Sequence, residues 1–329
     1  MSHDKHPVTL LTGFLGSGKT TFMNELMASR EDTRFAIIEN EVGETGIDGD
    51  LVLKSDKNLM EVNNGCLCCT LNDNLLEILK NLYERNEEWD ELLIEATGIA
   101  DPAGVAAPFF NQPGIHNNFE LQRIICLVDA GQIEELLQIE GVVAKQIGYC
   151  DAILLNKADT VAPSYLKSLK QRLRNSNPLA QIYSGQKGDY PLAEVLSNNG
   201  EVISKNLQNG HSSETGHNHD HHDYAHGEIN ALTFTFEEPF DINLLKNTLA
   251  SFLMFQAKDV YRLKGIVYDP VYSERLIIQS VMNTVAVERG TPWQSDEEPK
   301  SQFVLIGKNL KAKGHERMLR KGLRKSRTV

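Results

Sequence analysis

The sequence predicts an α/β fold with a mainly parallel sheet, followed by a smaller α+β domain. Through about residue 200, short apolar runs alternate with stretches of helical periodicity, which is typical of parallel strands covered by helices on both faces. Beyond residue 228, Leu232–Phe236 alternates apolar and polar residues, as a half-buried strand does. Residues 205–227 have little to bury and indicate a linker. We therefore expect domains at residues 1–204 and 228–329.

The expected strands of the first domain are apolar runs, at Val8–Thr12, Phe35–Glu39, Leu59–Val62, Leu92–Glu95, Ile124–Val128, Ile153–Asn156 and Gln181–Ser184. Amphipathic stretches lie between several of them, such as the one that carries Leu71, Leu75, Ile78, Leu79 and Leu82. In the second domain we expect strands and one helix, at Leu232–Phe236, Ile242–Phe255 (the helix), Val260–Tyr268, Leu276–Val287 and Phe303–Ile306. This pattern predicts a mainly antiparallel sheet. The basic tail Lys308–Arg327 is expected to be a solvated helix rather than an RNA or partner contact.

The composition excludes several classes of protein. A chain of 329 residues with 41% hydrophobic and 24% charged residues is globular and long enough for two domains. It has no apolar run long enough to cross a bilayer, and its formal charge of −12 argues against a general nucleic-acid binder. The N-terminal stretch lacks the features of an export signal, so we expect a cytoplasmic protein. Clustered thiols in a reducing compartment indicate metal binding or catalysis more often than disulfides.

Residues Gly13–Thr20 match the Walker A pattern and follow a predicted strand. Glycines in such a loop let backbone N–H groups close around phosphates, and the next helix directs its positive end at them. Lys19 is expected to reach the β- and γ-phosphates and assist catalysis, and the Thr20 hydroxyl to bind Mg²⁺. A chance glycine-rich turn would not explain the predicted strand and helix on either side. The first domain is therefore predicted to be a P-loop NTPase domain, with nucleotide contacts from Gly13, Gly16, Ser17, Gly18, Lys19, Thr20 and Thr21.

The segment Asn156-Lys157-Ala158-Asp159 ends a later predicted strand and indicates guanine. A carboxylate at Asp159 can accept hydrogen bonds from the N1–H and exocyclic amine of guanine, which adenine does not offer in that arrangement. We therefore predict GTP as the nucleotide, with its base bound by Asn156, Lys157 and Asp159. A plain strand-ending turn is the alternative, and the position late in a P-loop domain argues against it. Ser184–Gln186, after the next strand, is a candidate guanine-side loop.

Two acidic strand ends are candidates for catalysis and for metal contact. Glu95 ends an apolar run and is followed by Gly98, so Glu95 is expected to act on Mg²⁺ through water or to orient the attacking water, with Gly98 sensing the γ-phosphate. Glu39–Glu44 follows another strand, at the place where P-loop GTPases carry a switch. Glu39 and Glu44 are candidates to contact Mg²⁺, the hydrolytic water or a second metal ion. An exposed acidic turn is the alternative for this segment.

Three thiols within four residues, Cys66, Cys68 and Cys69, lie between a predicted strand and a predicted helix. A helix N-terminus lowers the pKa of a thiol, and thiolates bind soft or borderline ions such as Zn²⁺, Co²⁺ or Cu⁺. Cys68 and Cys69 are adjacent and cannot easily both point at one ion together with Cys66. A site of two thiolates with other ligands is therefore an open alternative. Small packing residues in a loop are the other interpretation. Cys126 and Cys150 are expected to be inert core thiols.

A histidine-rich tract in the linker is a second candidate metal-binding segment. Its members include His217, His219, His221 and His222. Imidazoles on a flexible chain bind many divalent ions with little selectivity, because no fixed geometry selects among them. A solvated linker is the alternative. We expect the tract to load or buffer metal ions.

Six segments, in their order along the chain, closely resemble the CobW-type metallochaperone GTPases. They are the Walker A loop, the Glu39–Glu44 turn, the three thiols, the Glu95–Gly98 segment, the Asn156–Asp159 segment and the histidine-rich linker. Three later segments are similar to that family's C-terminal domain, namely Tyr261–Gly265, Thr291–Trp293 and Phe303–Gly307. The resemblance therefore covers essentially the whole chain. It implies a GTPase that carries Zn²⁺ or a related ion to a client metalloprotein. It also implies that Cys66, Cys68 and Cys69 supply the metal site.

These observations lead to one main hypothesis and two alternatives. GTP and Mg²⁺ would order the Glu39–Glu44 turn and the thiol loop, and hydrolysis would relax both and lower the affinity for the metal ion. One alternative is a metal-binding buffer with a vestigial nucleotide site, against which the intact Lys19, Thr20 and Asp159 argue. Another is a small-molecule kinase, which the guanine motif disfavours. The client is not identified by the sequence, and a homodimer stays open.

Overall fold

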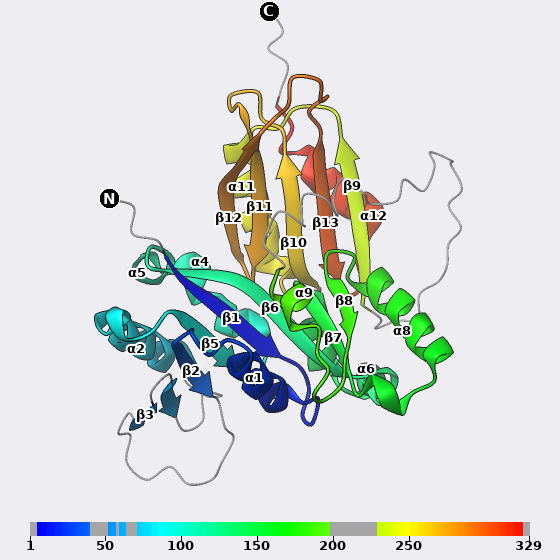
Figure 1. The fold of residues 1–329 in the computed structure, drawn as a ribbon. Helices are drawn as coiled ribbons and strands as arrows, with labels where there is room; N and C mark the ends of the chain where they lie inside the picture. The colour runs from blue at the N-terminus through cyan, green and yellow to red at the C-terminus, as the bar shows by residue number, and fades with distance from the viewer. Residues whose placement is uncertain (1–4, 40–51, 57–58, 64–70, 198–228, 325–329) are drawn as a thin grey trace, which may run out of the picture. The chain divides into compact units, whose positions relative to one another are not determined.

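The computed structural model describes residues 5–39, 52–56, 59–63, 71–197 and 229–324 (Figure 1). The chain divides into two compact units, one of residues 1–174 and 180–200, the other of residues 175–179 and 201–329. Each unit has its own sheet. Within the described ranges, no helix has the length and apolar character that a membrane span requires.

An eight-stranded sheet forms the first unit, in the order β3-β4-β2-β5-β1-β6-β7-β8. Every neighbouring pair is parallel except β3 and β4. The strands are β1 His6–Thr12, β2 Phe35–Glu39, β3 Val52–Asp56, β4 Leu59–Asn63, β5 Glu91–Glu95, β6 Phe119–Asp129, β7 Ala152–Asn156 and β8 Gln181–Ser184. The predicted parallel sheet is confirmed. The sequence did not predict β3, whose apolar residues are only Val52 and Leu53.

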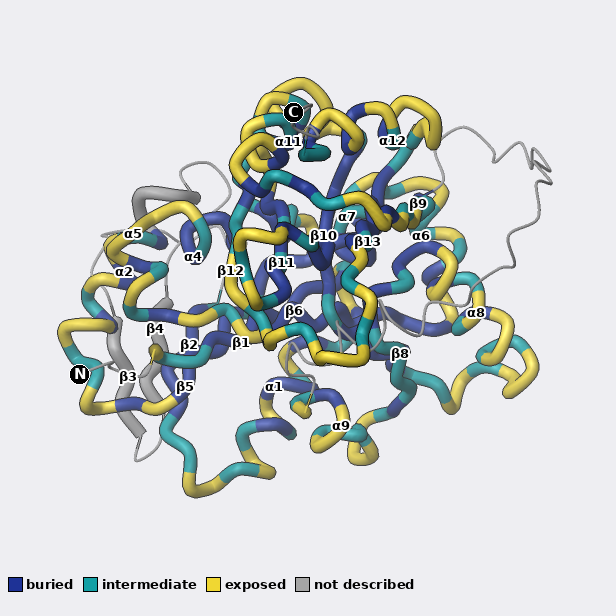
Figure 2. Tube along the Cα trace, turned by 90° about the horizontal axis from the view of Figure 1, so that it is seen from above, coloured by how far each residue is buried: buried dark blue, intermediate teal, exposed yellow. Residues whose placement is uncertain are grey.

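Helices follow the strands of the first unit and bury them. They are α1 Lys19–Ala28, α2 Leu71–Glu84, α3 Pro102–Ala106, α4 Pro108–Asn111, α5 Pro113–His116, α6 Ile133–Ile139, α7 Gly141–Tyr149, α8 Pro163–Ser176 and α9 Leu192–Leu196, with 3-10 turns at Asn86–Glu88 and Ala158–Thr160. One core cluster joins Phe22 of α1 and Val195 of α9 to strand residues such as Leu11 and Ile125. All five residues of β7 are buried, which requires cover on both faces of the sheet. Figure 2 shows the buried dark blue of the neighbouring β6, whose last seven residues are all buried.

The second unit is a five-stranded antiparallel sheet in the order β12-β11-β10-β13-β9. Its elements are β9 Asn230–Phe236, α11 Ile242–Gln256, β10 Val260–Val267, β11 Glu274–Val281, β12 Thr284–Pro292, β13 Ser301–Gly307 and α12 Ala312–Arg320. The single strand predicted at Leu276–Val287 is wrong, because a tight turn at Met282 divides it into β11 and β12. Met282 has a left-handed φ of 54°, which no glycine, asparagine or proline at that position signals.

The helix predicted in the basic tail is present as α12, but it is not simply solvated. His315, Met318 and Leu319 are buried, and the latter two belong to the core cluster of the second unit. Residues three and four positions apart share one face of a helix. The basic residues therefore occupy the opposite face, and the tail forms part of the folded domain.

Candidate functional site

Glycines shape the loop between β1 and α1. Gly13, Gly16 and Gly18 have φ values of 136°, 73° and 96°, a region that other residues rarely adopt. A Cβ atom on Gly13 would lie 2.1 Å from the carbonyl oxygen of Leu127, and one on Gly18 would lie 2.3 Å from Nδ2 of Asn156. The strand, loop and helix expected around the Walker A motif are therefore present, and the loop needs its glycines for both conformation and space.

The Lys19 side chain is held inside this loop. It is 7% exposed, and its Nζ donates to the carbonyl oxygens of Gly13 at 3.0 Å and Phe14 at 3.3 Å. Burial lowers the pKa of Lys19 below 10.5, and the charge of Glu95 partly opposes that shift. An ammonium ion whose partners are neutral carbonyls gains from an added anion. The arrangement thus favours phosphate at the loop.

Thr20 and Glu95 bring hard oxygen atoms together beside the loop. The Thr20 hydroxyl lies 3.1 Å from each carboxylate oxygen of Glu95. Glu95 ends β5, and its register partner on β2 is Glu39. Hydroxyl and carboxylate oxygens at such a spacing are ligands that suit Mg²⁺. The structure therefore places Thr20, Glu95 and Glu39 at one edge of the sheet.

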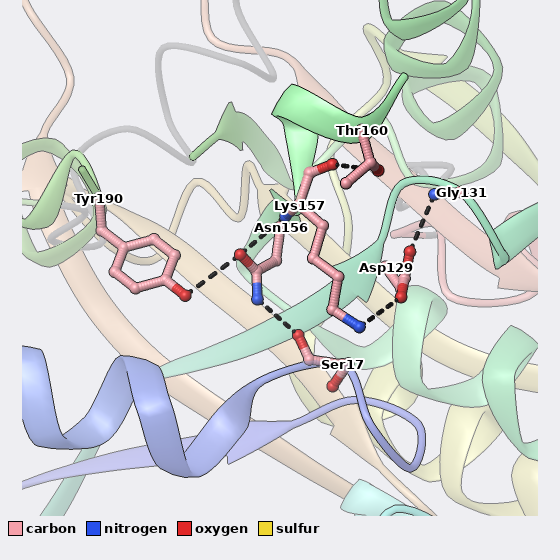
Figure 3. Close-up of polar contacts among 7 residues, drawn as sticks. All are labelled: Ser17, Asp129, Gly131, Asn156, Lys157, Thr160 and Tyr190. Carbon is pink, nitrogen blue, oxygen red and sulfur yellow. Dashed lines mark hydrogen bonds and ion pairs between the residues drawn. The ribbon is translucent and has the colours of Figure 1, made fainter. Parts of the chain in front are cut away.

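Asn156 connects the end of β7 to the phosphate loop (Figure 3). Its Nδ2 donates to the carbonyl oxygen of Ser17 at 2.8 Å. Its Oδ1 accepts from the backbone N–H of Lys157 at 2.8 Å and from the hydroxyl of Tyr190 at 3.1 Å. Asn156 is buried, so these bonds satisfy an amide that water does not reach.

Lys157 turns the chain at the end of β7 through a left-handed φ of 55°. Its Nζ forms an ion pair with Oδ2 of Asp129 at 2.7 Å, and Oδ1 of Asp129 accepts from the N–H of Gly131 at 2.9 Å (Figure 3). The neighbouring Asp159 is exposed. Within the described residues it has no hydrogen bond or ion pair, so its carboxylate is available to a ligand.

The expected guanine-side loop lies next to this segment. The N–H of Ala158 donates to the carbonyl oxygen of Gly185 at 3.2 Å, and the N–H of Gly185 donates to Leu155 at 2.9 Å. Sequence reasoning missed Asp129 and Tyr190. Asp129 directly follows the predicted strand Ile124–Val128, which is a signal that could have identified it. Tyr190 carried no such signal.

Gly98 lies beneath the tip of the phosphate loop, because a Cβ atom there would be 2.5 Å from the backbone nitrogen of Leu15. This close approach explains why glycine is needed at that position. Cys126 and Cys150 are buried, as expected of core thiols.

The residues predicted to bind transition metal ions lie largely outside the described residues. These are Cys66, Cys68, Cys69, Glu44, His217, His219, His221 and His222. Across the described ranges, no group of three or more His, Cys, Asp or Glu side chains is placed to hold a metal ion. Glu39 is described, and its register partner on β4 is Asn63, the last residue of that strand. Asn63 precedes Cys66 by three residues in the sequence.

Comparison with known proteins gives the family. Residues 7–184 match the CobW/HypB/UreG nucleotide-binding domain, and residues 229–324 match the cobalamin synthesis protein CobW C-terminal domain. The chain belongs to the CobW family. The zinc chaperone YjiA of Escherichia coli K12 is 33% identical to this CobW-family protein over 307 residues, which cover 92% of this chain and 94% of YjiA. The zinc-regulated GTPase metalloprotein activator 1 of Saccharomyces cerevisiae is 28% identical, over 98% of this chain and 85% of the relative.

A solved structure supports the same assignment. The crystal structure of Zn(II)-bound YjiA GTPase from E. coli matches this CobW-family protein with a TM-score of 0.71 and 28% identity, and covers 98% of this chain and all of that one. The predicted family and the predicted fold class, a P-loop NTPase domain with a smaller α+β domain, are confirmed.

Proposed function

We propose that this CobW-family protein is a GTP-hydrolysing metallochaperone that binds Zn²⁺, or a related ion such as Co²⁺, and transfers it to a client metalloprotein. The observation that carries the proposal is the register of three neighbouring strand ends. Asn63, Glu39 and Glu95 align across β4, β2 and β5. The chain that leads to Cys66, Cys68 and Cys69 thus leaves the sheet at the edge where Thr20 and Glu95 meet.

The geometry of the site supports a set of nucleotide contacts. Gly13, Gly16, Ser17, Gly18 and Thr21 would surround the phosphates with backbone N–H groups, and Lys19 would neutralise their charge. Asn156, Lys157 and Asp159 would hold the guanine base, with the Asp159 carboxylate reading its N–H groups. Asp159 is exposed and unengaged within the described residues, which supports a role in ligand binding.

Thr20 and Glu95 fit Mg²⁺ by their chemistry. Both offer oxygen atoms, and the hydroxyl lies 3.1 Å from the carboxylate. Mg²⁺ would supply positive charge to the β- and γ-phosphates. Thr20 would contact it through its hydroxyl, and Glu95 or Glu39 would orient the attacking water.

The strand register also supports coupling between the nucleotide and the metal ion. Glu39 pairs with Glu95 of β5 on one side and with Asn63, the last residue of β4, on the other, so a change in contacts at Glu95 would be passed to the strand that precedes the thiols in the sequence. GTP would therefore raise the affinity for Zn²⁺, and by linkage Zn²⁺ would raise the affinity for GTP by the same factor. Without a supplied arginine we expect slow turnover, on the order of 10⁻³ to 10⁻² per second.

The decisive experiment measures Zn²⁺ affinity by competition with a chelating dye, with GTP, with GDP and without nucleotide. We expect the tightest binding with GTP. The triple variant Cys66→Ser, Cys68→Ser, Cys69→Ser should lose tight binding but keep GTP binding. Cys150→Ser, which alters a buried thiol, is the matched control.

Equal Zn²⁺ affinity in all three nucleotide states would contradict the proposal and favour a metal-binding buffer. Deletion of residues 211–226, which removes the histidine-rich tract, should lower the number of ions bound and leave the tight site intact. Loss of the tight site on this deletion would move the proposed cargo site from the thiols to the linker.

A further inference from the structure

We propose that Tyr190 is a positioning residue that holds the guanine-binding segment Asn156–Asp159 against the phosphate loop. This inference rests on the proposed binding of GTP. Tyr190 lies beyond the nucleotide motifs in the sequence and in no motif of its own. In the fold, it contacts three segments that the nucleotide would bind.

The first contact is through its hydroxyl. The Tyr190 O–H donates to Oδ1 of Asn156 at 3.1 Å, and Nδ2 of the same amide donates to the carbonyl oxygen of Ser17 at 2.8 Å (Figure 3). Asn156 is 3% exposed, so its amide has few solvent partners if it turns. The tyrosine hydroxyl therefore helps to hold the amide in the orientation that donates a hydrogen bond to the phosphate loop.

The second contact is through the ring. A Cβ atom on Gly185 would lie 2.9 Å from Cδ1 of Tyr190, so the ring rests against that glycine. The carbonyl oxygen of Gly185 accepts from Ala158, which lies between Lys157 and Asp159. The ring thus supports the position of the segment that carries the base-reading carboxylate.

The third contact attaches this loop to α1. The rings of Tyr190 and Phe22 meet edge to face with centroids 5.3 Å apart. Close by, the N–H of Gly188 donates to Oε1 of Glu25 at 2.8 Å. Since α1 begins at Lys19, one helix adjoins the phosphate loop at its N-terminus and contacts Gly188 and Tyr190 through Glu25 and Phe22.

The hydroxyl remains a donor at neutral pH. Burial raises the pKa of Tyr190, and the charge of Glu25 raises it further. A neutral phenol can donate to Oδ1 of Asn156, whereas a phenolate could not. Removal of this one hydroxyl, with the ring retained, isolates the positioning role from the packing role.

The test compares Tyr190→Phe with Tyr183→Phe. Both tyrosines are partly buried and pack against the same core cluster. The Tyr183 hydroxyl contacts Oε1 of Gln181 and, at 3.0 Å, the carbonyl oxygen of Glu194, away from Asn156. The affinities for GTP, GDP and ATP are measured by fluorescence, together with KM, kcat and the unfolding temperature.

For Tyr190→Phe we expect GTP and GDP to bind about three- to tenfold more weakly, the effect of one lost hydrogen bond in a buried network. The ratio of GTP to ATP affinity should fall, because only guanine uses the aligned segment. KM should rise while kcat at saturating GTP stays near the wild-type value, and the unfolding temperature should fall no further than that of Tyr183→Phe. Tyr183→Phe, which loses hydrogen bonds away from Asn156, should keep the wild-type nucleotide affinities, KM and kcat.

Three outcomes overturn the inference. If Tyr190→Phe binds GTP as Tyr183→Phe does, or loses stability and ATP affinity in proportion, the hydroxyl has only a structural role. If the wild-type protein shows no preference for GTP over ATP, both this inference and the proposed function fail. If the wild-type protein prefers GTP over ATP and Tyr190→Phe keeps the wild-type affinity for GTP, only the positioning role is contradicted.

Discussion

The carboxyl edge of the parallel sheet has two sides that differ in how their polar groups are arranged. On the side of β6, β7 and β8, the polar groups around the exposed Asp159 bond to one another: Asp129 pairs with Lys157, and Asn156 joins Ser17 to Tyr190. On the side of β5 and β2, two carboxylates, Glu95 and Glu39, end adjacent strands in register. We name these the base side and the acid side.

The difference indicates different roles for the two sides. Groups already held by hydrogen bonds lose little conformational freedom when a ligand binds, so the base side is preorganised. The acid side places two carboxylates at paired positions of adjacent strands, with the Thr20 hydroxyl beside Glu95. Like charges at paired positions destabilise each other, so a cation bound there would be favoured. We therefore expect the acid side to respond to the state of the nucleotide, while the base side holds guanine in every state.

The largest expected effect comes from Lys19→Ala, which removes the ammonium that lies between the two sides. The developing charge on the phosphates would lose one fixed positive group, so kcat/KM for GTP should fall about 10²- to 10³-fold. The GTP-dependent gain in Zn²⁺ affinity should also disappear, because the acid side no longer senses the phosphates. Phosphate release and dye competition measure both. Lys80→Ala, at an exposed position of α2, is the control.

A variant with near-normal turnover would show that Lys19 does not contact the transferred phosphate.

The acid side should divide into two functions when each carboxylate is neutralised separately. Glu95→Gln should lower kcat about 10²-fold, the lower end of the usual contribution of a positioned acid–base group, with little change in GTP affinity. Glu39→Gln should instead lower Zn²⁺ affinity in the GTP state. Single-turnover hydrolysis and dye competition separate the two effects. Because the residues are neighbours, the double variant should deviate from additivity.

Additive effects in that double variant would contradict coupling across the acid side.

The sequence predicted the sheet and the nucleotide motifs because both depend on local patterns. Continuous apolar runs identify buried parallel strands, and a phosphate loop needs glycines at fixed spacing. The ends of Phe35–Glu39 and Gln181–Ser184 agree with the structure. The β11–β12 turn was missed because Met282 adopts a left-handed conformation without a residue type that favours it.

Contacts between distant segments could not be predicted in the same way. Tyr190 and Asn156 are 34 residues apart, and Asn156 and Ser17 are 139 apart, so only the fold brings them together. The alignment of Glu39 with Glu95 likewise depends on the order of β2 and β5 in the sheet, which apolar runs do not give. The transition-metal residues other than Glu39 lie outside the described residues, and their assignment stays a prediction.

A smaller effect is expected on the base side from Asp129→Asn. This change removes the ion pair that holds Lys157, whose side chain is 44% exposed, so solvent already weakens the interaction. GTP and GDP should each bind about threefold more weakly, by the same factor, because the base side does not sense hydrolysis. Glu134→Gln, which breaks an exposed ion pair with Arg172, is the control. Unequal losses for GTP and GDP would show that the base side is also state-dependent.

The smallest expected effect is a pH dependence that comes from Lys19. Burial lowers its pKa in the free protein below 10.5, and bound phosphates favour its charged form and raise the pKa again. The complex then holds more protons than the free protein, so GTP affinity should fall as the pH rises through the alkaline range below 10.5. Without nucleotide, the unfolded chain binds more protons than the folded protein over this range, so the free energy of unfolding should rise with pH. Calorimetry in buffers of different ionisation enthalpy measures the proton taken up on binding, and denaturant unfolding of the wild type and Lys19→Met measures the second effect. If both proteins show the same pH slope, the buried ammonium is not its source.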